Sequence, residues 1–206
     1  MGLAPIRSIA MSMLLLACGG DDDGGGSGDA PDQGDAAAGD VDGAITVDAG
    51  EGSKIIFVTS TTHNGDVNGP DGADGICGDR AGEADLEGTF KAWMSGATSA
   101  SARLAHFDGP YRRTDGVKVA DDWDDLTDGS LDAAISRDEN GDGVADDAWT
   151  GTTAAGAADT ARCEDFEDGT LGASGVCGST TATNGQWSDR LVPGCNTALR
   201  LFCVQQ

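Results

Sequence analysis

The last stretch of the sequence, residues 187–203 (WSDRLVPGCNTALRLFC), constrains the fold more than any other. Its final residues alternate so that Leu199, Leu201 and Cys203 share one face, as in a strand that closes a core. A terminal strand has no local partner, so Cys195 and Cys203 must bond to cysteines far upstream. The sequence therefore predicts a domain that is closed by disulfides and ends in a core strand.

Composition limits the classes of partner and compartment. The 206 residues include 36 acidic and 12 basic ones, for a net charge of −24. Such a charge repels nucleic acid, heparin-like polyanions and anionic lipid headgroups. The 33 glycines and ten aromatic residues indicate a loop-rich fold with a modest core. Six widely spaced cysteines without a CxxC pair favour an oxidising compartment over a zinc cluster.

The amino terminus predicts export and lipidation. Arg7 precedes a short apolar run that is below the roughly 20 residues needed to span a membrane. Residues 15–18 (LLAC) resemble the bacterial lipobox, which is cut before its cysteine. Residues 1–17 are then a lipoprotein signal peptide, and lipid on Cys18 anchors the chain in the bacterial cell envelope, at the outer membrane or cell surface. The alternative is an ordinary signal peptide with a chance cysteine at position 18.

Residues 18–53 predict a disordered tether. Ten of them are acidic, none is basic, and large apolar side chains are scarce. Such a segment cannot bury enough surface to offset an ordering cost of about 1–2 kcal/mol per residue. The acidic run at residues 21–23 is similar to sorting signals of some surface lipoproteins, although it also suits a merely soluble linker.

Three patterned segments predict a mixed α+β domain over residues 54–206. Residues 54–60 (KIIFVTS) are too continuously apolar for a one-sided surface strand, so they belong in the core. Residues 70–86 begin with proline and repeat small apolar residues at helical spacing. Their four glycines weaken this helix, so packing has to hold it. Residues 89–95 (TFKAWMS) predict a second strand.

These elements belong to a longer ordered set of motifs. Residues 72–95 (GADGICGDRAGEADLEGTFKAWMS) resemble the first helix and following strand of endostatin, the C-terminal domain of certain collagens. They are also similar to a family of bacterial endostatin-like lipoproteins. Later landmarks follow in the same order at residues 117–129, 148–151, 163–166, 195 and 199–204. The resemblance covers residues 54–206 and implies a C-type lectin-like fold, an antiparallel sheet with flanking helices and long loops on one side.

The disulfide pairing depends on this resemblance. Five domain cysteines alone allow fifteen ways to draw two bridges, which is five choices of unpaired cysteine times three pairings. The family pattern implies Cys77 with Cys203 and Cys163 with Cys195. Cys177 is left over and is either a small buried hydrophobe or a free thiol that joins two chains in a dimer.

Residues 138–147 (DENGDGVADD) carry the clearest site chemistry of the sequence. Oxygen-bearing side chains alternate before a glycine, as in the calcium loops of EF-hands and thrombospondin-type repeats. The twelfth position holds Trp149 in place of the bidentate Glu of an EF-hand, which favours the thrombospondin-like alternative. A solvated turn is the other interpretation. The predicted calcium ligands are Asp138, Asn140, Asp142, Asp146 and the carbonyl oxygen of Val144.

Residues 187–189 (WSD) resemble the Trp-Asn-Asp strand that carries calcium ligands in sugar-binding C-type lectins, with Ser188 in place of Asn. The Glu-Pro-Asn sugar motif is missing, so Trp187 is expected in the core. His63 and His106 lie in expected loops outside any catalytic motif, and neighbouring carboxylates such as those at residues 121–122 and 124–125 should point apart.

We therefore expect a binding module and not an enzyme. Its recognition surface is placed on loops over residues 103–147, and its ligand is an unidentified protein or glycan. The alternatives are a structural envelope lipoprotein without a specific ligand and, less in keeping with the motifs, a hydrolase.

Overall fold

Strand β7 lies at the centre of the fold and is hydrogen-bonded to three other strands. The computed structural model describes residues 52–206, so the predicted signal peptide, Cys18 and most of the predicted tether lie outside the described residues. In chain order the elements are β1 (Lys54–Val58), α1 (Gly69–Glu83), β2 (Phe90–Ala92), α2 (Ala100–Arg103), β3 (Tyr111–Arg112), β4 (Lys118–Ala120), α3 (Trp123–Thr127), β5 (Asp147–Trp149), α4 (Cys163–Phe166), β6 (Cys177–Ser179), the 3-10 turn η1 (Gly185–Trp187) and β7 (Arg200–Gln205).

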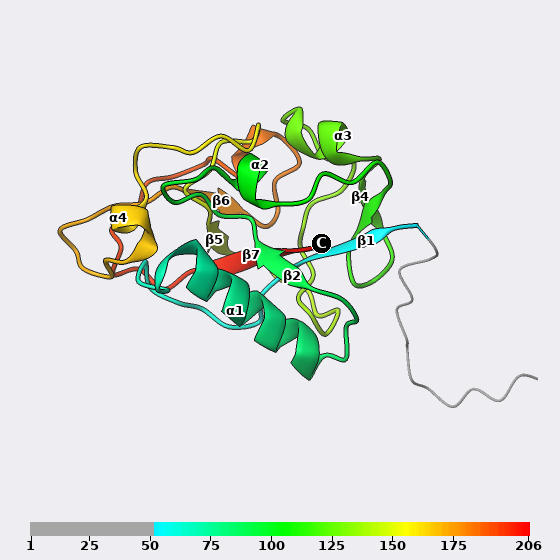
Figure 1. Cartoon of the computed structure of the whole chain (residues 1–206), viewed down its shortest axis with the longest axis horizontal. Coiled ribbons are helices and arrows are strands. Elements are labelled where there is room, and N and C mark those ends of the chain that lie inside the picture. Colours follow the sequence, from blue (N-terminus) through cyan, green and yellow to red (C-terminus); the bar gives the residue numbers. More distant parts are fainter. Residues whose placement is uncertain (1–51) are drawn as a thin grey trace, which may run out of the picture. The chain divides into compact units, whose positions relative to one another are not determined.

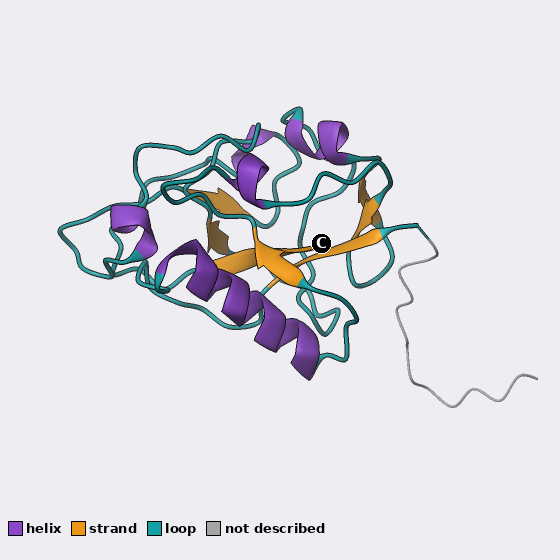
Figure 2. Cartoon of the chain, in the orientation of Figure 1, coloured by secondary structure: helices purple, strands orange, loops and turns teal. Residues whose placement is uncertain are grey.

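The strands form one mixed, curled sheet in the order β4-β3-β1-β7-β5-β6, with β2 also paired to β7 (Figures 1 and 2). On one side, β1 runs antiparallel to β7, with Ile56 opposite Val204. On the other side, β2 pairs antiparallel with residues 203–205, and β5 pairs parallel with residues 200–201. The last strand of the sequence is thus an interior strand, as its cysteines and alternation predict.

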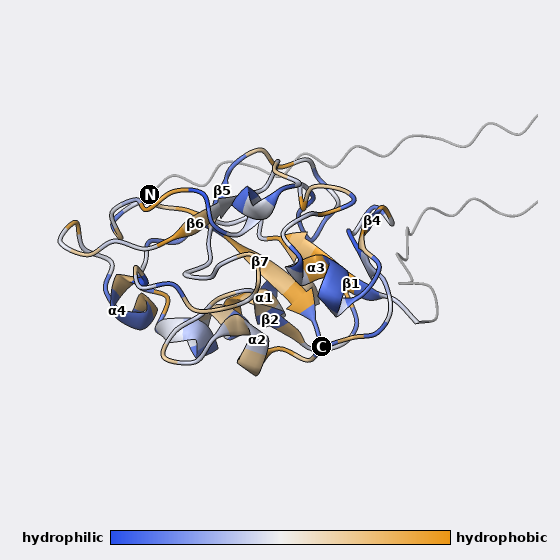
Figure 3. Ribbon diagram, turned by 90° about the horizontal axis from the view of Figure 1, so that it is seen from above, coloured by the Kyte–Doolittle hydropathy of each residue, from blue (hydrophilic) through white to orange (hydrophobic). Residues whose placement is uncertain are grey.

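Both faces of the sheet are buried, which gives the domain two apolar layers. Leu201 and Cys203 of β7 pack with Phe57 and the inner face of α1. Phe202 and Val204 face the opposite layer, which contains three tryptophans, at positions 93, 123 and 187. Figure 3 shows β7 as a hydrophobic strand along most of its length. The alternation at the end of the sequence predicts one apolar face, and the structure adds a second one beneath the long loops.

Helix α1 confirms the helix predicted over residues 70–86 and shows why it tolerates its glycines. The buried residues of the helix include Ala73, Cys77 and Ala81, so small side chains let it lie close to the sheet. Gly72 is required, because a Cβ at this position would lie 1.9 Å from the carbonyl oxygen of Val67. Glycine is less favourable than alanine in a helix by about 1 kcal/mol, yet at position 72 only glycine leaves room for the backbone that leads into α1.

Two disulfides tie this arrangement together, in the pairing implied by the endostatin-like resemblance. Cys77 of α1 bonds to Cys203 of β7, and Cys163 bonds to Cys195. The Cα atoms of the two pairs are 5.5 and 5.7 Å apart, within the usual range for a disulfide. The first bridge joins the helix to the central strand across 126 positions of sequence.

The second bridge holds an uncommon backbone. All four residues of α4 have positive φ, from 50° to 65°, so α4 is a left-handed turn. For residues with a Cβ this costs roughly 1–2 kcal/mol each. Cys163 and Phe166 are fully buried, and the Phe166 N–H group donates to the carbonyl oxygen of Arg162 at 2.6 Å. Packing and the disulfide together offset the strain.

Candidate functional site

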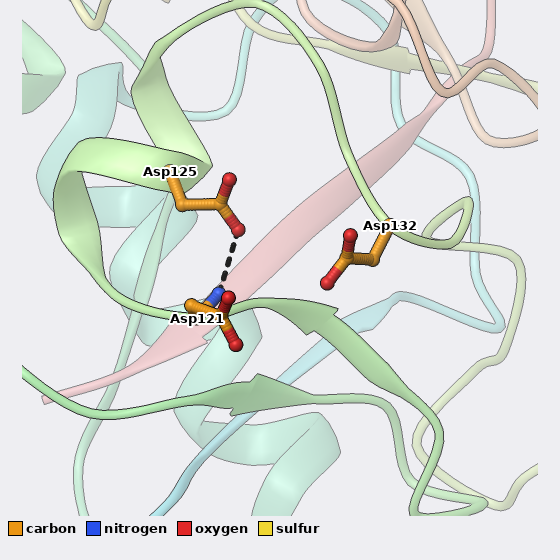
Figure 4. A group of neighbouring side chains, drawn as sticks. All are labelled: Asp121, Asp125 and Asp132. Atoms are coloured by element: carbon orange, nitrogen blue, oxygen red, sulfur yellow. Dashed lines mark hydrogen bonds between the residues drawn. The ribbon is translucent and has the colours of Figure 1, made fainter.

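Three aspartates come together where β4 enters α3. Asp121 and Asp125 flank the start of this helix, and Asp132 lies on the following loop (Figure 4). Each offers one carboxylate oxygen, and these oxygens all lie within 4.8 Å of one another. We call Asp121, Asp125 and Asp132 the aspartate cluster. It could hold a metal ion, because hard divalent cations are bound in proteins by several carboxylate oxygens.

Local hydrogen bonds fix two members of the aspartate cluster. Asp122 is the N-cap of α3, and its side chain accepts from the Asp125 N–H group at 2.9 Å. The Asp125 carboxylate in turn accepts from the Asp121 N–H group at 2.7 Å (Figure 4). This exchange satisfies backbone donors at the helix start, as capping side chains do. The third member is placed by the backbone, since Asp132 N–H donates to the carbonyl oxygen of Val119 at 2.9 Å.

Lys118 competes with any cation for this cluster. Its ammonium group pairs with Asp121 and, at 2.8 Å, with Asp132. Hydrogen bonds to these two carboxylates raise the pKa of Lys118 above its ordinary value. Three carboxylates and one ammonium leave a net charge of −2, which is the right charge for a divalent cation but requires Lys118 to swing aside or share its partners.

The predicted calcium loop forms a tight turn. The Oδ1 atom of Asp138 accepts from the N–H groups of Asn140 and Asp142, at 3.0 and 2.9 Å, and the side chain is almost fully buried. Asp146 pairs with Arg200 at 3.1 Å, and the Val144 carbonyl oxygen accepts from Thr180 at 3.4 Å.

Within residues 52–206, the aspartate cluster is the acidic trio with converging carboxylates, and Asp138, Asp142 and Asp146 do not form such a trio. In the turn, one carboxylate oxygen of Asp138 closes the loop, while the other oxygen has no hydrogen-bond or ion-pair partner among the described residues. Calcium coordination through Asn140 and the Val144 carbonyl stays a prediction.

Glu139, in the same loop, is a buried carboxylate that the sequence interpretation missed. It is 4% exposed, and it accepts from both the N–H group and the hydroxyl group of Ser60, the former at 2.8 Å. These bonds attach the loop to the end of β1. The EF-hand-like spacing predicts ligands at alternate residues, whereas Glu139 lies between two of them and anchors the loop.

The two histidines occupy different settings. His63 has its pKa lowered by burial and by the charge of Arg80, and its Nε2 atom lies 3.0 Å from the Thr61 hydroxyl. His106 stacks on Trp123 with the ring centres 4.0 Å apart. Trp187 is fully buried, as expected.

Cys177 is unpaired and 1% exposed, which matches the interpretation of a small buried hydrophobe. Burial raises the pKa of its thiol to about 12, and the negative charge of Asp147 acts in the same direction. A disulfide to a second chain would require this sulfur to be exposed first.

Fold and site together define a mixed α+β domain, closed by two disulfides, that carries a cluster of three aspartates next to a lysine. A scan against models of known protein families finds no match for this chain, and a search among curated proteins finds none either. In the part of the chain that the structure describes, no helix has the length and apolar character needed to cross a membrane.

Proposed function

We propose that this protein is a surface-tethered binding module of the bacterial cell envelope. In this proposal, residues 54–206 form a C-type lectin-like domain of the endostatin-like kind. Lipid on Cys18 and the acidic segment that follows hold the domain at the membrane surface. The observation that carries the proposal is the pair of disulfides, Cys77–Cys203 and Cys163–Cys195, because the endostatin-like resemblance implies the same two bridges.

The loops over residues 103–147 are the proposed recognition surface. They contain thirteen acidic and five basic residues. Four of the five basic side chains are in ion pairs, and Arg112 donates to the carbonyl oxygen of Gly116. Unpaired carboxylates therefore dominate this surface, and a protein or glycan ligand would be drawn to it by positive charge of its own or through a bridging cation.

Calcium is the proposed cation. Carboxylate oxygens suit calcium, and a flexible loop suits it better than magnesium, which demands a tight octahedral shell. Two positions are open to it, the turn at Asp138 and the aspartate cluster. A cation that binds only the folded chain stabilises it by about 2.7 kcal/mol at a hundredfold excess over its Kd.

Thermal melting of the full chain with and without calcium tests whether calcium binds, and variants show which of the two positions binds it. The double variant Asp138→Asn with Asp142→Asn removes two charges from the turn, and Asp121→Asn with Asp132→Asn is the matched change in the aspartate cluster. The calcium-dependent rise in Tm should vanish in one of them only. If the aspartate cluster is the site, Lys118→Met should strengthen the response, because it removes the competing ammonium group. An unchanged Tm of the wild-type chain at millimolar calcium would refute the proposal that the domain binds calcium.

Fractionation and pull-down test the rest of the proposal. Cys18→Ala should move the protein from membranes to the soluble fraction, since the lipid is the proposed anchor. The full chain should also retain a partner that excess unlabelled chain displaces. Membrane retention of the unlipidated variant would contradict the anchor, and the lack of any saturable partner would favour a purely structural role in the envelope.

A further inference from the structure

The folded domain contains five cysteines, and all of them lie in one apolar layer. This is the layer that also holds the inner face of α1, and its cysteines are Cys77, Cys163, Cys177, Cys195 and Cys203. Four of them form the two bridges, so among the described residues Cys177, at the start of β6, is the one that keeps its thiol.

Cys177 lies next to the second bridge both along the chain and in the fold. It comes 14 positions after Cys163 and 18 before Cys195, whereas the bridge itself spans 32. A Cβ on Gly175 would lie 2.7 Å from the Cys163 sulfur. Residues two apart on an extended segment share a face, so the Cys177 side chain lies on the face against which the bridge packs. The fold therefore brings this thiol and this disulfide into the same part of the core.

Loop lengths favour early bridges to Cys177. The probability that two points of an unfolded chain meet falls roughly as the −3/2 power of their separation. Cys177 therefore meets Cys163 about three times, and Cys195 about twice, as often as those two meet each other. Oxidation of the unfolded chain should thus produce non-native bridges to Cys177, which have to be rearranged before the native pairing is complete.

The number of cysteines decides whether such bridges can be rearranged. Five cysteines in two bridges always leave one thiol, so each of the fifteen arrangements can pass into another by exchange. Four cysteines in two bridges leave no thiol, and the two wrong pairings among the three possible ones would be fixed. A chain without Cys177 would then depend on a thiol from outside.

The native fold makes the same thiol unreactive. Cys177 is 1% exposed, and its N–H group donates to the carbonyl oxygen of Leu191 at 2.9 Å. Burial raises the pKa of Cys177 to about 12, and the charge of Asp147 acts in the same direction. Below pH 9, its thiolate is therefore about a thousandfold scarcer than that of a thiol with the ordinary pKa of 9.0. Since the thiolate is the attacking species, exchange stops once the native pairing is reached.

We propose that Cys177 is an internal exchange thiol that brings the two disulfides of this chain to their native pairing and is then buried. In each step a cysteine thiolate attacks one sulfur of a non-native bridge, and a new S–S bond forms as the old one breaks. The displaced sulfur leaves as a thiolate and takes up the proton that the attacking thiol lost, so no oxidant or reductant is consumed. In the last step, Cys195 attacks Cys163 in a Cys163–Cys177 bridge, and Cys177 is released. This role goes beyond the proposed binding function and does not depend on it.

The test starts from full chains whose bridges have been formed at random in urea. The reference chain carries Cys18→Ala, so that the five domain cysteines remain, and the test variant carries Cys177→Ala in addition. Both are moved to urea-free buffer at about pH 8 without any added thiol, quenched with acid at intervals and mapped as peptides. We expect the reference chain to collect in the Cys77–Cys203 and Cys163–Cys195 pairing, whereas the variant keeps its starting mixture.

Two controls separate the thiol of Cys177 from its packing. Reduced glutathione, added as an outside thiol, should bring the Cys177→Ala variant to the native pairing. A chain with Cys177→Ala that keeps Cys18 again has five cysteines, but its extra thiol lies 145 positions before Cys163. Its rearrangement should be several-fold slower than that of the reference chain, because the longer loop closes less often.

Three results would overturn the proposal. The first is equal rearrangement of the reference chain and the Cys177→Ala variant without added thiol, and the second is a reference chain that keeps its random bridges. The third is a chain with Cys18 in place of Cys177 that rearranges as fast as the reference. Failure of glutathione to rescue the variant would assign the defect to lost packing at position 177, which also contradicts an exchange role.

Discussion

Removing the two disulfides one at a time should cost different amounts of stability, and loop length sets the order. The bridges join residues 126 and 32 positions apart. In the chain-entropy model these closures restrict the unfolded chain by about 4.9 and about 3.7 kcal/mol at 25 °C. The variant Cys77→Ala with Cys203→Ala should therefore lose more than Cys163→Ala with Cys195→Ala. Small domains have a total free energy of unfolding of about 5–15 kcal/mol, so loss of the first bridge would remove a large part of the stability of this domain.

Urea unfolding followed by tryptophan fluorescence measures both losses. All four cysteines are fully buried, so each alanine also removes packing. The variant Cys177→Ala measures the stability lost with the packing alone, because Cys177 is a buried cysteine without a bridge. Twice this loss is subtracted from the loss of each double variant, which has two such substitutions. The second bridge also holds the left-handed turn of α4, and release of that strain should widen the difference. An equal or larger loss for the Cys163/Cys195 variant would refute loop entropy as the main contribution.

Three further predictions follow from single sites. Burial alone would raise the pKa of Asp115, but hydrogen bonds from Arg113 and Arg137 outweigh it and lower the pKa to about 2. The folded state thus favours the ionised form of Asp115. Its contribution to the free energy of unfolding is present above about pH 4 and is lost as the pH falls toward about 2. Asp115→Asn should remove roughly 1–2 kcal/mol of this pH dependence in acid unfolding curves. Gly178→Ala should destabilise by several kcal/mol or prevent folding, because its Cβ would lie 1.8 Å from the carbonyl oxygen that ends η1; normal expression and an unchanged Tm would contradict this. Cys177 should resist alkylation near neutral pH until urea unfolds the chain, since its thiol is buried and its pKa is raised to about 12; rapid labelling of the native chain would show that the site opens.

The sequence predicts the long elements well, because each carries a pattern of its own. The apolar run at residues 54–60 becomes β1, the spaced small residues become α1, and the final alternation becomes β7. Strands β3 and β4 are two and three residues long and carry no comparable signal. Strand β3 pairs with β1, which is distant in the sequence, and β4 is held only through β3, so both pairings form only in the folded chain. The left-handed turn of α4 could not be foreseen either, since cysteine, glutamate, aspartate and phenylalanine ordinarily avoid it.

The aspartate cluster was missed for a physical reason. Adjacent carboxylates along a chain point apart, so the pairs at residues 121–122 and 124–125 are not expected to converge on one site. The relevant spacing was i, i+4 across a helix start, from Asp121 to Asp125, with Asp122 between them as the N-cap. That capping pattern is visible in the sequence DDWDD. The third member, Asp132, is placed by a backbone hydrogen bond to Val119 of β4, and no sequence pattern predicts this contact.

The distribution of charge in the folded domain narrows the class of ligand further than net charge does. Residues 54–206 contain 26 acidic and 11 basic residues. Eight of the basic side chains are in ion pairs, and the other three, Lys54, Lys91 and Arg112, donate to backbone carbonyl oxygens. In the described residues every basic side chain is therefore engaged, while many carboxylates are not. An anionic ligand would have to compete with an existing ion pair or with a backbone carbonyl oxygen for each basic side chain, whereas a cation meets carboxylates that have no ion-pair partner. This asymmetry supports the proposed calcium ion, because a cation brings the charge that the folded surface lacks.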